Sequence, residues 1–461
     1  MTRSTRPDTS TSPPWPPGPA SGLTGWQLLA SMSSDLLGSL SRWQHAHGDL
    51  VHLRIWPEHE VVVSNPTLVR ELLVTRHDDL VRWERGIRAF RRVQGQTVLT
   101  TEGEAWRAKR QAVQPALSPK ALQPFIQTIA DAAAHAMDRW PTHHAAWPIE
   151  SAFTSLAMDL ILRLMFTQPA AEDIGAVEAA VHTVLTTTNA EMFWPASWPD
   201  WMPWKRRKHR ATRLLKGLVE RHVQRRLACD EAGWPEDLLS RLLRLHRSDA
   251  ARWPLEAVRD ECITTFLAGH ETVAATLTWW AWCMAANPRA QARAQEEVAQ
   301  VLEGAAPGAQ HLPRLRWLNA TLQETLRLYP AAPVLFTRRG ERAVQLGAWH
   351  FPARTMFIVP VQGLHHDARW FPEPMAFRPE RFVDGAEPPP RGAFLPFGAG
   401  PRVCVGQHLA MAELTIVAAL VLQRLELRVP AGLPPPRPVL QISLRPEEPL
   451  KLDVQPVPAR P

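Results

Sequence analysis

The feature that most restricts the fold is a long interval without proline. Proline accounts for 44 of the 461 residues, roughly twice its average usage in proteins. Even so, no proline occurs between Pro254 and Pro288. Proline is tolerated in the first turn of a helix but breaks a helix interior. The interval therefore predicts one unusually long helix over residues 254–286, running through the middle of a domain.

Outside this interval, apolar periodicity predicts further helices and a few short strands. Helices are expected at residues 65–73, across most of 117–251, at 313–328 and at 405–425. Strands are expected at residues 48–56, 61–64 and within 344–361. No repeat or compositional break marks a linker. We therefore expect one mainly α-helical (α+β) domain with small β-sheets over residues 21–461, after a flexible proline-rich leader at 1–20.

Composition excludes several classes of protein. With 21% charged and 45% hydrophobic residues, the chain is neither disordered nor collagenous. The four cysteines lack CxxC spacing, which argues against a disulfide framework or a zinc site and favours a reducing, cytoplasmic compartment. The longest uncharged apolar stretch, residues 272–286, is shorter than the ~20 residues that a membrane-spanning helix needs. No transmembrane anchor is expected.

One segment near the C-terminus carries a dense chemical pattern. Residues 397–406 run Phe-Gly-Ala-Gly-Pro-Arg-Val-Cys-Val-Gly. Glycines let a backbone turn tightly and approach a flat ligand. Cys404 is expected at the start of a helix, where the dipole favours a thiolate, and Arg402 offers a cation for an acidic ligand edge. The segment matches FxxGxRxCxG at every fixed position and so resembles the haem-binding loop of cytochromes P450.

This resemblance implies a single cytochrome P450 fold, with many helices around haem b and Cys404 as the axial thiolate ligand of the iron. Thiolate ligation pushes electron density toward iron and favours O–O cleavage. The resemblance also assigns a further set of residues to the haem environment: Arg402, Phe397, Gly398, Gly406 and Ala268.

The long helix carries a second motif. Residues 268–272 run Ala-Gly-His-Glu-Thr and resemble the acid–alcohol pair of the family. Gly269 is expected to permit a local break in the helical hydrogen bonds, where Thr272 would hold a water or a bound oxygen species. Glu271 is expected to begin a proton relay. Taken alone, the same pentapeptide describes a helix glycine and a threonine bonded back to a carbonyl.

Three residues resemble a structural cluster of the family. Glu324 and Arg327 lie one helical turn apart and are able to form an ion pair. Arg381 belongs to a Pro-Glu-Arg-Phe sequence. The resemblance implies that these three side chains lock the core beside the cysteine loop.

Two motifs resemble haem-propionate contacts of the family. Trp106 and Arg110 lie four residues apart, hence on one helix face. Alone, the pair is equally a tryptophan packed against an arginine stem. Arg338 or Arg339 is a further propionate ligand, and the sequence leaves open which of the two points inward.

Two other patterns are interpreted as structural. The His-His-Asp sequence at residues 365–367 is expected not to bind metal, because adjacent side chains diverge. Four tryptophans between residues 194 and 204, followed by six basic residues at 205–210, are compatible with a membrane-surface or nucleic-acid patch. We expect instead a solvated helix start after an aromatic lid, at the substrate-gating loop of the family, and no nucleic-acid partner.

The reaction implied by the resemblance is monooxygenation, in which one atom of O2 enters a hydrophobic small molecule and the other leaves as water. Only 57 residues follow Cys404, so electrons are expected from a separate protein. Arg107, Lys109 and Arg110, with the net charge of +7, predict docking of an acidic ferredoxin or flavodoxin served by an NAD(P)H reductase.

The chain looks similar to monomeric, soluble bacterial hydroxylases of fatty acids and carotenoids. Two alternatives stay open at this point. One is an H2O2-dependent peroxygenase, and the other is a haem-thiolate sensor or binding protein without turnover.

Overall fold

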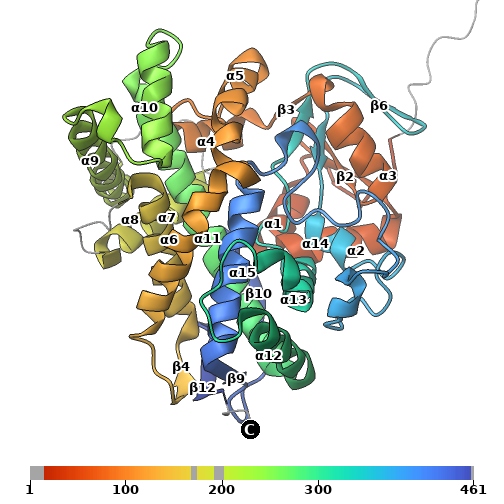
Figure 1. Cartoon of the computed structure of the whole chain (residues 1–461). Helices are drawn as coiled ribbons and strands as arrows, with labels where there is room; N and C mark the ends of the chain where they lie inside the picture. Colours follow the sequence, from red (N-terminus) through yellow and green to blue (C-terminus); the bar gives the residue numbers. More distant parts are fainter. Residues whose placement is uncertain (1–14, 168–173, 192–201, 458–461) are drawn as a thin grey trace, which may run out of the picture.

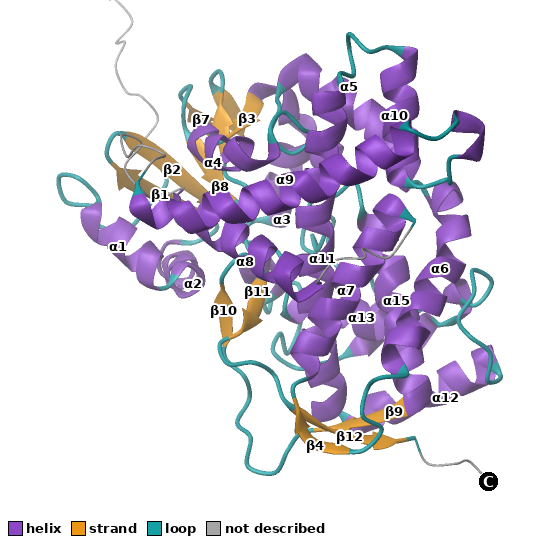
Figure 2. Cartoon of the chain, turned by 90° about the vertical axis from the view of Figure 1, so that its left-hand side faces the viewer, coloured by secondary structure: helices purple, strands orange, loops and turns teal. Residues whose placement is uncertain are grey.

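The computed structural model describes residues 15–167, 174–191 and 202–457 of the chain (Figure 1). Helices dominate these ranges, and the strands form small sheets (Figure 2). The predicted mainly α-helical class is therefore confirmed. None of the helices in the described ranges is both long and apolar enough to cross a membrane.

The helices that precede residue 250 are α1 (Trp26–Ser34), α2 (Leu36–His47), α3 (Pro66–Arg70), α4 (Glu84–Gln94), α5 (Gly103–Val113), α6 (Pro119–Met137), α7 (Ile149–Phe166), α8 (Ile174–Glu191), α9 (Arg206–Leu227) and α10 (Leu238–Ser248). The later helices are α11 (Leu255–Ala286), α12 (Pro288–Leu302), α13 (Arg316–Leu328), α14 (Val361–His365) and α15 (Gln407–Arg424).

The largest sheet brings together strands that are far apart in the chain. Its order is β1-β2-β8-β5-β3, and its strands are β1 (Leu50–Ile55), β2 (Glu58–Val63), β3 (Leu80–Arg82), β5 (Arg338–Gly340) and β8 (Met356–Ile358). Only β2 and β8 pair in parallel. The smaller sheets contain β4 (His144–Trp147), β12 (Leu452–Pro456) and β9 (Leu425–Arg428); β10 (Pro438–Leu440) and β11 (Leu444–Pro446); and β6 (Val344–Leu346) and β7 (Trp349–Phe351).

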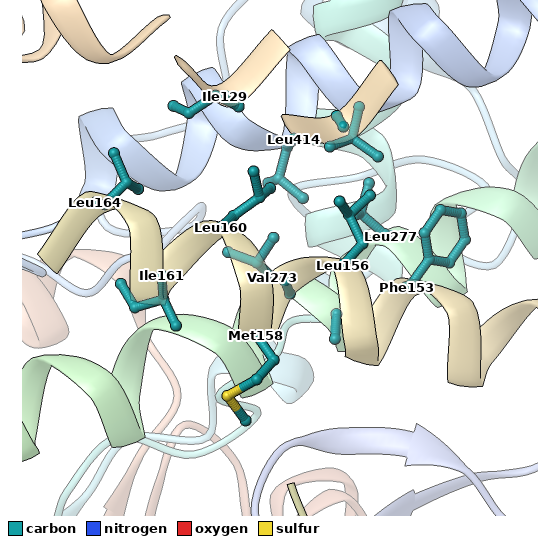
Figure 3. Packing of buried hydrophobic residues seen from close by; sticks show 14 of the residues in the cluster. Ile129, Phe153, Leu156, Met158, Leu160, Ile161, Leu164, Val273, Leu277 and Leu414 are labelled. Atoms are coloured by element: carbon teal, nitrogen blue, oxygen red, sulfur yellow. The ribbon is translucent and has the colours of Figure 1, made fainter. Parts of the chain in front are cut away.

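Helix α11 is the long helix predicted from the proline-free interval. Pro254 precedes its first residue, and the helix continues for 32 residues to Ala286. Its apolar side chains meet those of α6, α7 and α15, where Leu160, Val273 and Leu414 pack together (Figure 3). A helix that is apolar on nearly all sides belongs in the middle of a core, which is where Figure 1 shows α11.

The glycine in α11 serves the packing of two helices. A Cβ atom added to Gly269 would lie 2.8 Å from Cδ1 of Ile161 on α7. The helix is continuous through this residue, so the expected break at Gly269 is wrong for this structure. A small residue here lets α7 approach α11 closely, and this contact needs no interruption of the helical hydrogen bonds.

Three boundaries differ from those predicted. The helix expected from residue 313 begins at Arg316, because a short 3-10 turn at Leu312–Arg314 precedes it. The helix expected over residues 405–425 is α15, which spans Gln407–Arg424. Trp15 stacks on His52 with 4.3 Å between ring centroids, and the His52 N–H donates to the Pro17 carbonyl. The part of the leader from Trp15 to Gly18 therefore packs against β1.

Candidate active site

The loop that carries Cys404 is closed by its own backbone. The Cys404 N–H donates to the Phe397 carbonyl at 2.9 Å. Gly398 and Gly400 adopt positive φ angles of 77° and 72°. A Cβ on Gly400 would lie 2.1 Å from the Leu73 carbonyl oxygen, so only glycine fits there. The loop ends at Gly406, the N-cap of α15.

The Cys404 side chain has a mixed environment. It is exposed to solvent, yet protein surrounds it closely enough that desolvation raises the pKa of its thiol. The Gly406 backbone and the Arg110 guanidinium act in the opposite direction and favour the thiolate. Since a coordinating metal cation deprotonates a thiol outright, a metal-bound ligand over Cys404 fits this environment.

Three arginines gather around one carboxylate. Arg82 Nε lies 2.7 Å from Oε1 of Glu102, and Arg402 forms an ion pair with Oε2 of the same residue. Arg338 is the cross-strand partner of Arg82 in the pairing of β3 with β5. Like charges directly opposite each other destabilise a sheet. The four side chains together carry a net charge of +2.

The protonation of this arginine cluster shows how strongly it is crowded. Burial lowers the pKa of Arg402 to about 9 and that of Arg338 to about 10, and the positive charge of Arg82 adds to both effects. A ligand with two anionic groups would relieve this repulsion. The two propionates of a haem carry that charge, so the cluster fits the group that the Cys404 loop implies.

Trp106 and Arg110 contact different parts of this site. Trp106 is 8% exposed, and the Arg402 guanidinium lies 4.1 Å above its ring. Arg110 Nη1 donates to the Val403 carbonyl at 2.7 Å. The structure thus places Arg110 against the cysteine loop, which differs from the propionate contact expected for it.

The pleat of β5 separates the two arginines that the sequence left undecided. Arg338 lies at the arginine cluster through its pairing with Arg82. Arg339 Nη2 lies 2.8 Å from Glu58 and its Nε 3.2 Å from Glu84. Successive side chains on a strand point to opposite faces. Arg338 is therefore the one available to a ligand.

One short face in the middle of α11 is exposed, although the side chains around it are mostly buried. Ala268 and Thr272 are exposed, and their spacing of four residues places them on the same face. Thr272 Oγ1 donates to the Ala268 carbonyl at 3.1 Å. The threonine is therefore bonded back to its own helix, while its side chain borders open space.

Glu271 is tied into an ion-pair network. Arg445 on β11 donates to both of its oxygens at 2.7 and 2.9 Å, and Ser443 donates at 2.9 Å. Arg445 also pairs with Glu150 of α7 at 2.7 Å. Burial opposes ionisation of Glu271, but Arg445 outweighs it and lowers the pKa of the carboxyl. A carboxylate held ionised is a poor proton donor, which differs from the relay expected from the sequence.

The Glu324 cluster lies under the cysteine loop. Arg327 binds Glu324 through two hydrogen bonds of 2.7 and 2.8 Å, and both residues are fully buried. Arg381 Nε lies 3.4 Å from Glu324. Arg327 also donates to the His365 carbonyl at 2.7 Å, and the His365 ring accepts from the Leu395 N–H at 2.8 Å. The cluster thereby fixes the chain two residues before Phe397.

The His365 ring makes structural contacts, with the Leu395 N–H and with the Arg327 carbonyl. In the described ranges, no group of three or more His, Cys, Asp or Glu side chains is placed to hold a metal ion. Residues 194–201 of the tryptophan-rich segment lie outside the described residues.

Sequence reasoning missed several residues of the site. Arg82 and Glu102 meet Arg402 from chain positions some 300 residues away, and Arg445 reaches Glu271 across 174 residues. None of them stands in a local motif. Only the pairing of β3 with β5 and the packing of β11 on α11 bring these groups together.

Comparison with known proteins gives consistent relatives. A family model described as Cytochrome P450 matches residues 14–454. The cyclooctat-9-en-7-ol 5-monooxygenase of Streptomyces melanosporofaciens is 31% identical, covering 91% of this chain and 91% of the relative. Cytochrome P450 734A2 of Oryza sativa subsp. japonica is 31% identical, covering 84% of this chain and 75% of the relative. The chloroplastic protein LUTEIN DEFICIENT 5 of Arabidopsis thaliana is 27% identical, covering 88% of this chain and 72% of the relative.

Proposed function

Because the chain belongs to the cytochrome P450 family, we propose that it inserts one oxygen atom from O2 into a hydrophobic small molecule, by hydroxylation or epoxidation. Haem b is the cofactor of this family, and its enzymes are monooxygenases that take electrons from redox partners. The observation that carries the proposal is the exposed Cys404 thiol, held in a closed loop close to Arg402 and its cluster of net charge +2.

Each part of this site has a role in holding the cofactor. Cys404 would ligate the iron, and the +2 cluster with Arg338 and Arg402 would bind the two propionates. Gly398 leaves room for the flat ring beside the loop. When bound, the haem supplies the redox chemistry that activates dioxygen. The Glu324 cluster keeps the loop rigid, so that little ordering is required when the cofactor binds.

The open face of α11 supplies the proton-handling group. Ala268 is small and leaves space beside the helix, and Thr272 carries the only hydroxyl on this face that the motif provides. By rotating away from the Ala268 carbonyl, its hydroxyl donates a hydrogen bond into that space. Glu271, bound to Arg445, acts as a positioning residue that anchors this turn of α11 to β11.

The proposed substrate is bulky and apolar. Phe336 is 39% exposed and lies edge-on to Phe90, with 5.6 Å between ring centroids. Both aromatic rings lie near the strands that carry the arginine cluster, and apolar walls with few polar groups are typical of sites for such ligands. One relative is named for the oxygenation of cyclooctat-9-en-7-ol, which supports a cyclic, mainly hydrocarbon substrate.

The proposed electron donor is a separate acidic ferredoxin or flavodoxin with its NAD(P)H reductase, acting on a cytoplasmic monomer. Arg107 on α5 is 48% exposed, and its pairs with Asp78 and Glu104 are exposed as well. Such pairs exchange readily for the carboxylates of a partner. Arg110 lies one helical turn away and contacts the cysteine loop itself.

The test is product formation under 18O2 with NADPH and a surrogate ferredoxin pair. We expect one labelled oxygen atom in the product, and Thr272→Ala should consume NADPH with several-fold less product. Thr276→Ala is the matched control, since Thr276 also bonds back to a carbonyl four residues earlier. Product from H2O2 without NADPH would identify a peroxygenase, and haem binding without any product would identify a sensor.

A further inference from the structure

The positive charge of this protein resides on one helix. Helix α9 contains nine lysine and arginine residues and a single glutamate, a net charge of +8. The whole chain carries +7, so all residues outside α9 together carry −1. Figure 1 shows α9 on the outer flank of the molecule, and Figure 2 shows it crossing the surface of that flank.

Most of this charge is exposed and unpaired. Lys208 is buried with Glu191, and Arg226 is bound to Asp237. Among the residues that the structure describes, five exposed arginines of α9 have no ion pair or hydrogen bond from their side chains: Arg206, Arg207, Arg210, Arg213 and Arg225.

The folding of α9 does not require these arginines. Its other face packs Ala211, Leu215 and Leu218 against α8 and α11. Like charges three or four residues apart, such as Arg206, Arg210 and Arg213, destabilise a helix. The protein therefore maintains the row of arginines at a cost to its own stability, which an external anion would offset.

The shape and chemistry of the row indicate which anion. Residues 206–225 span about 28 Å of helix axis, and guanidinium groups bind phosphates through paired hydrogen bonds. Two apolar side chains stand beside the arginines: Trp204, which is 47% exposed, and Leu214, which is 37% exposed. A nucleic-acid duplex would use the arginines alone, because its bases are stacked on each other, whereas the boundary layer of a bilayer accepts both kinds of side chain.

A second helix extends the same surface. Arg92 of α4 is exposed and lies near the N-terminal half of α9, since its positive charge contributes to lowering the pKa of Lys208. We propose that the outer face of α9, with the adjoining face of α4, is a peripheral docking surface for membranes rich in anionic phospholipid. A hydrophobic substrate concentrates in such membranes, so docking would bring the protein to its supply.

The test is sedimentation of the full-length holoprotein with vesicles at low and high salt. We expect binding to phosphatidylglycerol vesicles, no binding to phosphatidylcholine vesicles, and loss of binding as salt rises. The variant Arg206→Gln/Arg210→Gln/Arg213→Gln should bind about a hundredfold more weakly, because each of the three basic side chains contributes about a fivefold factor at an anionic surface. Trp204→Ser should also weaken binding at low salt, because it removes an apolar contact with the bilayer.

The matched control is Lys120→Gln/Arg289→Gln/Arg391→Gln, which removes the same charge from exposed positions outside α4 and α9. It should bind as the wild type does. Unchanged thermal unfolding of both triple variants will show that folding is intact. Equal loss in both variants would overturn the proposal, as would absence of vesicle binding by the wild type. Binding to double-stranded DNA but not to vesicles would overturn it in favour of a nucleic acid. None of these outcomes depends on turnover.

Discussion

The molecule has two arginine-rich regions that differ in their exposure to water. Around Glu102, Arg82 is buried and Arg338 and Arg402 are half-buried, and burial together with mutual repulsion lowers the pKa of Arg402 to about 9. On the outer face of α9 the arginines are exposed to water, which screens them from one another. The inner cluster is incomplete without an anionic ligand, whereas the outer row is tolerated without one.

This contrast corrects the meaning of the net charge. From the sequence, the value of +7 was assigned to an acidic electron donor at Arg107, Lys109 and Arg110. In the structure, Arg107 pairs with Asp78, and Lys109 lies 3.5 Å from Glu261 and above the Trp253 ring. The excess charge lies on α9. A net charge describes a whole chain, so it does not locate a docking site.

The largest expected effect comes from replacing one of two exposed cysteines: Cys404, which follows Arg402, or Cys229, which follows α9. Cys404→Ser should abolish monooxygenation and the red-shifted band of the reduced carbon-monoxide complex, because the thiolate ligand is lost. Cys229, which follows α9, is the control, and Cys229→Ser should keep both. Absorbance spectra of the two variants check this. A red-shifted band that survived in Cys404→Ser would refute the assignment of the iron ligand.

A second comparison replaces one arginine in the core and one on α9. Arg327→Gln should cost about 3–5 kcal/mol of unfolding free energy, because it leaves the buried Glu324 carboxylate unpaired. Arg213→Gln should change it by less than about 0.5 kcal/mol. Urea unfolding measures both values. Similar losses in the two variants would mean that burial does not distinguish these charges.

A third comparison removes the carboxylate from each arginine-rich region. Glu102→Gln leaves three guanidinium groups without their anion and should destabilise the haem-free protein by about 1–3 kcal/mol. The loss should be smaller in the haem-loaded protein, because the propionates supply negative charge. Glu220→Gln on α9 should cost at most about 1 kcal/mol in either form. Thermal unfolding with and without haem measures these losses. An equal loss for Glu102→Gln in the haem-free and the haem-loaded protein would contradict a role of the arginine cluster in binding the propionates.

The last comparison concerns pH and a buried acid on α15. Burial raises the pKa of Glu413 to about 8, from 4.5 in the absence of structure. The native state therefore holds a proton that the unfolded state releases, so stability should fall as pH rises from about 4.5 to about 8. The contribution is about 1.4 kcal/mol per pH unit.

Glu413→Gln should flatten this decline, because the amide cannot ionise. The exposed Glu387→Gln serves as control and should leave the pH dependence of unfolding unchanged. Urea unfolding between pH 5 and pH 8 measures both. An unchanged slope in Glu413→Gln would show that another group is responsible.

Particular elements show how far sequence patterns reach. The proline-free interval predicted α11 to within a residue, because helix boundaries follow from local chemistry. The cysteine loop was equally predictable from the sequence, since its glycines are needed for positive φ angles of the loop backbone itself. The break at Gly269 was wrong because the need for glycine comes from Ile161 on another helix. The expectation for Glu271 likewise did not include its ion pair with Arg445, because Arg445 comes from a distant part of the chain.

The sequence alone determined the family, the long central helix and the thiol of the cysteine loop, because each depends on residues within about thirty positions of one another. Tertiary structure decided which arginine serves the ligand, that Glu271 is held ionised, and that the positive charge faces outward on one flank. The physical reason is that burial and charge pairing depend on neighbours in space, and the partners of Arg338, Glu271 and Glu102 come from distant parts of the chain.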